Sequence, residues 1–134
     1  MITEDYCSFE VAKLLKEKGF LKGIDLRTTQ NLSFYDNIGL RHNLNRWYDS
    51  LIQDKIDFIV APTHQMAMRW LREVHNIFIV IEPHMYDYIN EKNSSYVTSL
   101  WQGDNYYENV TSIDYSTYEE AVEATLKCVL KTLI

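Results

Sequence analysis

Four histidines and their acidic neighbours are the side chains of this sequence best suited to hold a metal ion or to move a proton. They are His42, His64, His75 and His84. A helix rises 1.5 Å per residue, so His64 and His75 would lie about 16 Å apart along one helix. One metal ion cannot bridge that distance. His64 stands at a predicted helix start, where a surface or capping role is expected.

A denser group of potential ligands is formed by Glu82, His84 and Asp87. Two carboxylates and an imidazole are ligand types that divalent metals accept, but loops also collect such residues by chance. The sequence has no glycine-rich phosphate loop, no nucleophile elbow and no CxxC pair. General acid–base catalysis needs two titratable groups that converge in a pocket, and the sequence alone identifies no such pair. We therefore assign no catalytic, cofactor-binding or metal-binding residue and predict no cofactor.

Lysines gather near the start of the chain, at Lys13, Lys16, Lys18 and Lys22. A basic helix can contact phosphates, so the Lys13–Lys22 region is the candidate for a nucleic-acid contact. The net charge of −6 opposes this reading, because an acidic surface repels a phosphate backbone. Nucleic-acid binding is therefore an alternative hypothesis, and a solvated lysine face is the simpler interpretation.

Composition predicts a single globular domain. The 134 residues are 46% hydrophobic and 24% charged, which is ordinary for a folded domain. Cys7 and Cys128 lie at opposite ends of the chain and predict free thiols. The N-terminal residues lack the pattern of a secretory signal, and no apolar run approaches the ~20 residues of a membrane span. These features predict a cytoplasmic protein without a membrane segment.

Hydrophobic spacing in residues 1–60 predicts a helical and extended N-terminal part. Ser8 is a suitable N-cap and Gly19 a suitable helix end, with apolar side chains on one side between them. Residues 31–35 alternate weakly and predict an extended segment. The spacing over 41–53 predicts a helix, and 56–61 predicts a short strand that Pro62 ends.

Residues 61–134 predict an α-β-β-β-α core. Thr63 caps a predicted helix over 63–75, whose inner arc includes Trp70 and Val74. A strand over 77–81 and two more over 96–101 and 106–113 follow, the last two joined by a tight turn. A helix over 117–133 ends the chain, with Val122 and Val129 on its inner side. The expected fold is α+β, a small antiparallel sheet of about three strands packed by helices 63–75 and 117–133.

The strand over 77–81 is apolar on both faces, which predicts that both are covered. The two helices of this core can cover only one face of a small sheet. The other face must therefore meet the N-terminal part or another chain. The ten tyrosines and three tryptophans of the sequence suit either a sheet surface or an interface.

Three separated segments carry a resemblance to a known family. They are MITEDYCSFEVAKLLKEKGF, APTHQMAMRWLREVHNIFIVI and STYEEAVEATLKCVLKTLI. Together they cover about half of the chain, and the chain resembles short uncharacterised proteins of gut Bacteroidales genomes and their prophages. The resemblance implies a bacterial or phage cytoplasmic protein and transfers no site residue.

The leading hypothesis from the sequence is a non-enzymatic module that binds another protein or a second copy of itself. Its contact surface would be an aromatic sheet face or the groove beside helix 63–75. The first alternative is a regulator that contacts nucleic acid through Lys13–Lys22. The second is a small-ligand binder or an enzyme, which requires a deep pocket.

Overall fold

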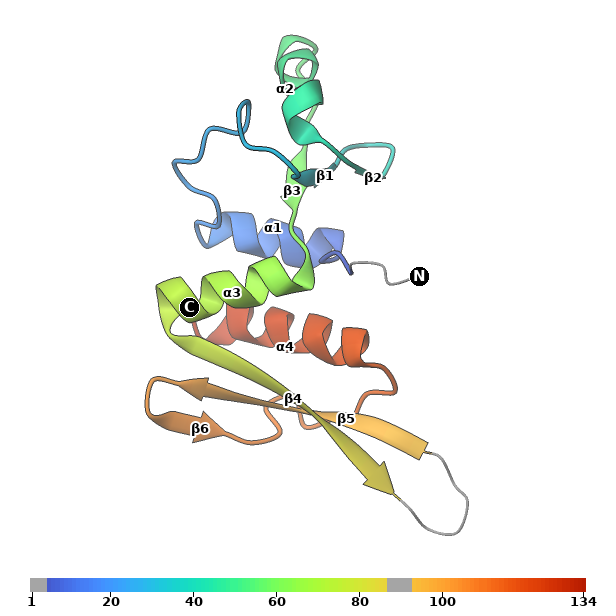
Figure 1. The fold of residues 1–134 in the computed structure, drawn as a ribbon, viewed down its shortest axis with the longest axis vertical. Coiled ribbons are helices and arrows are strands. Elements are labelled where there is room, and N and C mark those ends of the chain that lie inside the picture. The colour runs from blue at the N-terminus through green and yellow to red at the C-terminus, as the bar shows by residue number, and fades with distance from the viewer. Residues whose placement is uncertain (1–4, 87–92) are drawn as a thin grey trace. The chain divides into compact units, whose positions relative to one another are not determined.

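The computed structural model describes residues 5–86 and 93–134 and divides the chain into two compact units. The first unit comprises residues 1–66 and the second 67–134, so the boundary falls inside helix α3 (His64–His75). Each unit contains one three-stranded antiparallel sheet (Figure 1). The predicted α+β class is confirmed, and the sheet of the first unit is an addition to it. No helix of the described residues is both long and apolar enough to cross a membrane.

Helix α1 (Phe9–Glu17) begins and ends at the residues that the sequence indicates. The Ser8 hydroxyl accepts a hydrogen bond from the Val11 amide at 3.2 Å, which satisfies one of the unpaired donors of the first turn. Gly19 has a φ of +94°, a left-handed conformation that glycine adopts without strain. The buried side of this helix consists of Val11, Ala12 and Leu15.

Strands β1 (Ser33–Tyr35), β2 (Leu40–Arg41) and β3 (Ile59–Ala61) form the sheet of the first unit, in the order β2-β1-β3. Helix α2 (Leu44–Gln53) connects β2 to β3. It begins later than predicted because Asn43, before it, takes a left-handed φ of +60°. One core cluster of this unit joins Leu32 and Phe34, just before and within β1, to Leu44 and Leu51 of α2.

The turn between β1 and β2 is fixed by Asp36. Its carboxylate accepts hydrogen bonds from the backbone amides of Ile38 and Gly39 and from the Arg41 guanidinium, at 2.8 to 3.1 Å. Burial acts to raise the pKa of this carboxyl, since the side chain is only 2% exposed. The three hydrogen bonds and the charge of Arg41 outweigh burial, so the pKa of Asp36 lies below its ordinary value.

The sheet of the second unit consists of β4 (Ile77–Tyr86), β5 (Asn93–Gln102) and β6 (Asn105–Tyr107), in the order β4-β5-β6. β4 and β5 run past the predicted strand ends. Pro83 does not stop β4, because β4 is an edge strand and an edge tolerates the missing donor. β6 is shorter than the predicted strand 106–113, since Asn109 takes a left-handed φ of +52° and turns the chain.

Helix α4 (Tyr118–Thr132) packs on β4 and β5 (Figure 1). Thr117 caps it, accepting a hydrogen bond from the Glu120 amide at 3.1 Å. Val122 and Val129 are fully buried, as predicted.

Helix α3 matches the predicted range, but its buried side is rotated from the predicted one. The side chain of Val74 is 61% exposed, so its expected place in the core is wrong. His64 is only 6% exposed, which contradicts the surface alternative of its expected surface or capping role. The buried stripe keeps Ala67 and Leu71 of the predicted arc and extends to His64 and Met68, so the side that carries Val74 is left exposed.

Candidate functional site

The sheet of the second unit exposes a row of aromatic side chains on one face. Phe78 of β4 pairs in register with Trp101 of β5, which pairs with Tyr106 of β6. Directly opposite residues point to the same face of a sheet, so the three side chains form a continuous cross-strand row. They are 42 to 43% exposed, and the ring centroids of Trp101 and Tyr106 lie 4.9 Å apart. We call Phe78, Val80, Trp101 and Tyr106 the aromatic face.

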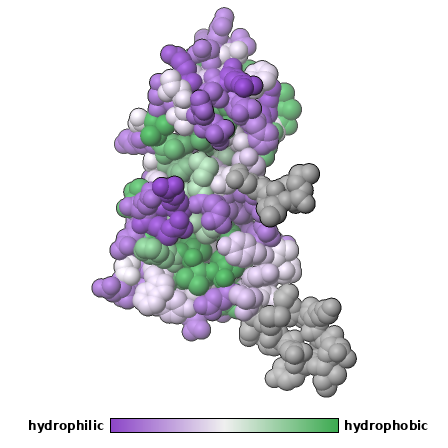
Figure 2. All heavy atoms as spheres, viewed as in Figure 1, coloured by the Kyte–Doolittle hydropathy of each residue, from purple (hydrophilic) through white to green (hydrophobic). Residues whose placement is uncertain are grey.

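The opposite face of the same sheet is the covered one. Ile77, Thr98 and Leu100 alternate with the aromatic face and are fully buried, and α4 packs against these strands. Strand alternation thus divides the apolar side chains of β4 and β5 between a core and an open surface. Figure 2 shows hydrophobic residues gathered over the part of the molecule that the sheet occupies in Figure 1.

An acidic hollow of about 540 Å³ belongs to the same sheet as the aromatic face. The acidic side chains that line it are Glu82, Glu108 and Asp114. The register of Glu82, opposite Val97, places it on the face that also carries Phe78. Asp114 accepts a hydrogen bond from the Ser95 hydroxyl at 3.2 Å. Exposed aromatic rings beside carboxylates suit a ligand that is both apolar and positively charged.

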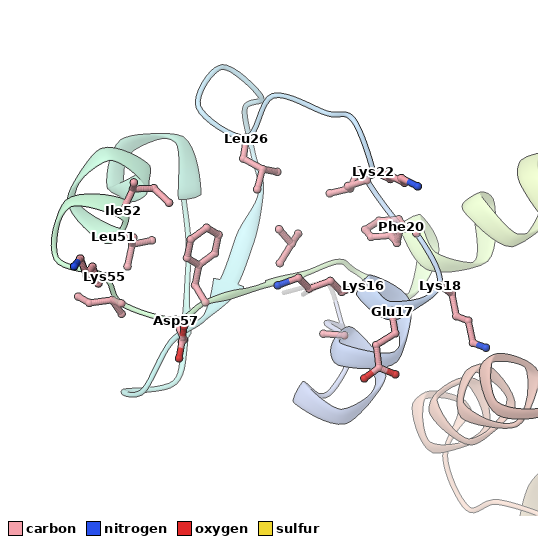
Figure 3. A pocket seen from close by; sticks show the side chains of 16 residues that line it. Lys16, Glu17, Lys18, Phe20, Lys22, Leu26, Leu51, Ile52, Lys55 and Asp57 are labelled. Atoms are coloured by element: carbon pink, nitrogen blue, oxygen red, sulfur yellow. The ribbon is translucent and has the colours of Figure 1, made fainter.

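The first unit contains a pocket of about 920 Å³ with the opposite character. Its walls come from the end of α1, the segment after it, the end of α2 and β3 (Figure 3). Apolar side chains cover much of the wall, namely Phe20, Leu21, Leu26, Leu51, Ile52, Ile56, Phe58 and Val60. Several of them also pack against the buried core of the unit, so the floor of the pocket is the outer surface of that core.

Four lysines line this pocket: Lys16, Lys18, Lys22 and Lys55. Figure 3 shows the Lys16 side chain extending into the pocket, whereas Lys18 and Lys22 point outward. The carboxylates among the lining residues, Glu17 and Asp57, are also directed away from its centre in this view. Three of the four lysines of the predicted basic region therefore line the pocket, and Lys13 does not.

Within each unit, the described residues do not bring the histidines and their acidic neighbours together. His75 has a buried Nε2 without a hydrogen-bond partner among the described residues, and its ring meets the Trp70 ring edge-on with centroids 4.7 Å apart. His84 lies in β4, and Asp87 lies outside the described residues. The described residues therefore do not test whether Glu82, His84 and Asp87 come together.

Ser33 and His42 form a serine–histidine pair that the sequence did not indicate. The Ser33 Oγ lies 2.7 Å from His42 Nδ1. Ser33 is only 4% exposed, which leaves its hydroxyl out of reach of a substrate. No described carboxylate orients the imidazole through its other nitrogen, and the ring instead contacts that of Tyr6, with centroids 5.5 Å apart. The pair therefore lacks the geometry of a nucleophile and its base.

Both surfaces combine residues from separate segments, and this is why sequence reasoning did not locate them. The predicted strands included Phe78, Trp101 and Tyr106, but only strand register places the three rings in one row. The pocket joins Lys16 to Lys55 and Phe58, which are remote in sequence. The run of apolar residues over 77–81 is a usable signal, because it indicates a strand with two apolar faces, of which the helices of the core can cover only one.

Comparison with known proteins adds no further assignment. No family model matches the chain, and no curated protein or solved structure matches it.

Proposed function

We propose that this protein is an interaction module whose aromatic face binds an extended segment of a partner protein that carries both basic and apolar side chains. The observation that supports this most strongly is the exposed row formed by Phe78, Trp101 and Tyr106. Aromatic side chains are enriched at protein interfaces, because a large ring gives much contact area at little entropic cost.

Charge favours a basic partner over a second copy of the chain. Glu82, Glu108 and Asp114 line the hollow in the same sheet, and residues 67–134 carry ten acidic and five basic side chains. Two copies facing each other would bring these carboxylates together, and like charges at an interface are unfavourable. Arginine or lysine would pair with the carboxylates and stack on the rings of Trp101 and Tyr106.

The edge of the sheet favours an extended conformation for the partner. β4 pairs only with β5 among the described residues, so its second edge offers backbone donors and acceptors. A peptide that adds to such an edge places alternate side chains on each face of the sheet. An apolar residue beside Phe78 and a basic residue four positions along, beside Glu82, would then both lie on the aromatic face. We place this accessory role in the bacterial cytoplasm, where the resemblance would locate the protein.

A peptide that carries leucine and arginine four positions apart, with serine between them, is the direct probe, and its matched control carries glutamate in place of arginine. Fluorescence anisotropy should show binding of the arginine peptide that weakens with added salt, and no binding of the glutamate peptide. Trp101→Ala should weaken it about tenfold, in line with the loss of an interface anchor. Glu82→Gln should weaken it less, and Glu119→Gln, an exposed change on α4, should leave it unchanged.

Two results would overturn the proposal. One is equal binding of both peptides, or binding that Trp101→Ala leaves intact. The other is a stable dimer by analytical ultracentrifugation that Trp101→Ala dissociates, because that result would assign the aromatic face to a second copy of the chain.

A further inference from the structure

The pocket of the first unit is a second binding site, and it has no part in the proposed protein contact. Its volume of about 920 Å³ lies within the range of small-molecule sites. It is lined from within residues 1–66, while the aromatic face belongs entirely to residues 67–134. We propose that this pocket binds a small amphipathic anion, a molecule with an apolar aromatic or acyl body and one anionic head.

The apolar body would lie on the outer surface of the core. Leu26, Phe58 and Val60 are half-buried, pack against the core cluster and line the pocket. The edge-on contacts of Phe58 with Phe34 and Tyr48, with centroids 6.3 and 6.1 Å apart, hold its ring in place. A preformed apolar floor of this kind binds an apolar group without first having to order its own side chains.

The chain segment after α1 is built to keep one wall of the pocket in position. Leu21 has a φ of +59°, a left-handed conformation that is costly for a leucine. Its half-buried side chain packs against the core cluster and lines the pocket. Packing therefore holds the backbone in a conformation that the residue would not choose by itself.

The anionic head would pair with Lys16. The side chain of Lys16 extends into the pocket (Figure 3), and it makes no ion pair or side-chain hydrogen bond with any residue that the structure describes. Lys55 lines the same pocket and has no such partner among the described residues either. Because the carboxylates of Glu17 and Asp57 point away, the charge that a ligand meets inside is positive.

The apolar and ionic contributions to binding can be measured separately with an aromatic sulfonate and its uncharged analogue. The probes are 1-anilinonaphthalene-8-sulfonate and N-phenyl-1-naphthylamine, which share the aromatic body and differ in the sulfonate. Fluorescence titration of the full chain should show tighter binding of the sulfonate. Lys16→Met keeps the apolar stem and removes the charge, so it should weaken sulfonate binding about tenfold and leave the uncharged probe unchanged.

Three controls keep this test specific. Lys13→Met removes a lysine of the same helix that does not line the pocket, and it should leave both probes unaffected. Lys55→Met should weaken sulfonate binding less than Lys16→Met does. Trp101→Ala should not change it, so this site and the protein contact can fail independently. Circular dichroism of each variant confirms that it is folded.

The proposal is overturned if both probes bind alike, or if Lys13→Met and Lys16→Met have the same effect. It is also overturned if a single-stranded oligodeoxynucleotide displaces the sulfonate and loses affinity in Lys13→Met. That outcome would assign the basic region to nucleic acid instead.

Discussion

Both units expose apolar side chains to solvent, but they do so in different ways and with charged groups of opposite sign nearby. In residues 1–66 the exposed apolar surface is a pocket formed by the ends of α1 and α2, by β3 and by the segment after α1, and the Lys16 side chain extends into it. In residues 67–134 it is one face of a regular sheet, and carboxylates lie beside it. The first unit carries nearly balanced charge, with eight basic and nine acidic side chains, while the second has twice as many acidic as basic ones.

This difference shows that local placement, more than net charge, determines what each surface can attract. The chain as a whole is acidic, yet the pocket of the first unit presents Lys16 toward its interior. Overall charge alone would direct every anion away from the protein. The arrangement of the side chains instead gives one unit an anion site and the other a cation site.

The largest expected effect on stability comes from truncating a buried side chain in the core beneath the pocket. Phe34 is fully buried, so Phe34→Ala should lower the free energy of unfolding by about 3–5 kcal/mol. Urea unfolding followed by circular dichroism measures this change. Ile38→Ala is the control, because Ile38 is largely exposed and its loss should cost less than about 0.5 kcal/mol. Equal costs for the two variants would mean that the core of the first unit is misassigned.

Neighbouring residues of β5 give a sharper contrast, because they point to opposite faces of the sheet. Leu100→Ala should cost about 2–5 kcal/mol, since the side chain is fully buried. Trp101→Ala should cost far less stability but weaken the arginine peptide about tenfold. Thermal unfolding and peptide anisotropy on the same two variants test this separation. A large loss of stability in Trp101→Ala would make the aromatic face part of the core.

Helix caps allow the same chemistry to be compared in both units. Ser8 and Thr117 each accept a hydrogen bond from an amide in the first turn of their helix. Ser8→Ala and Thr117→Ala should therefore each lower the free energy of unfolding by about 1 kcal/mol. Urea unfolding curves measure both. A cap without any effect would show that its helix end is not formed as described.

The smallest effect is the pH dependence that Asp36 gives to the first unit. Its folded-state pKa is lowered, so its contribution to stability is fully present above the unfolded-state pKa of about 4. That contribution is lost as the pH falls through the folded-state pKa. Asp36→Asn should therefore lower the melting temperature at neutral pH, and the difference from the wild type should disappear in acid. A difference that stays constant with pH would contradict this assignment.

Much of the fold could be predicted because local signals determine its elements. The Ser8 cap and the range of α3 are as the sequence indicates. Val74 shows the limit of this reasoning: it lies within the predicted apolar arc and is exposed, whereas Ala67 and Leu71 of the same arc are buried. In the first unit, β1 and β3 lie within the predicted extended segments, but β2 and the pairing into a sheet were not predicted, because the strands are only two or three residues long.

The candidate sites were less predictable than the fold, since each one depends on register or on distant segments. No periodicity in the sequence places Trp101 between Phe78 and Tyr106. The basic region was visible, but which of its lysines enters a pocket depends on the path of the segment after α1 and on the position of Phe58.

One NMR titration tests the contrast between the two units directly. Amide chemical shifts of isotope-labelled protein are followed as the naphthalene sulfonate and then the arginine–leucine peptide are added. The sulfonate should shift amides near Lys16, Leu26 and Phe58, and the peptide should shift those near Phe78 and Trp101. If both probes shift the same set of amides, the two surfaces do not differ in what they bind, and the division into an anion site and a cation site is wrong.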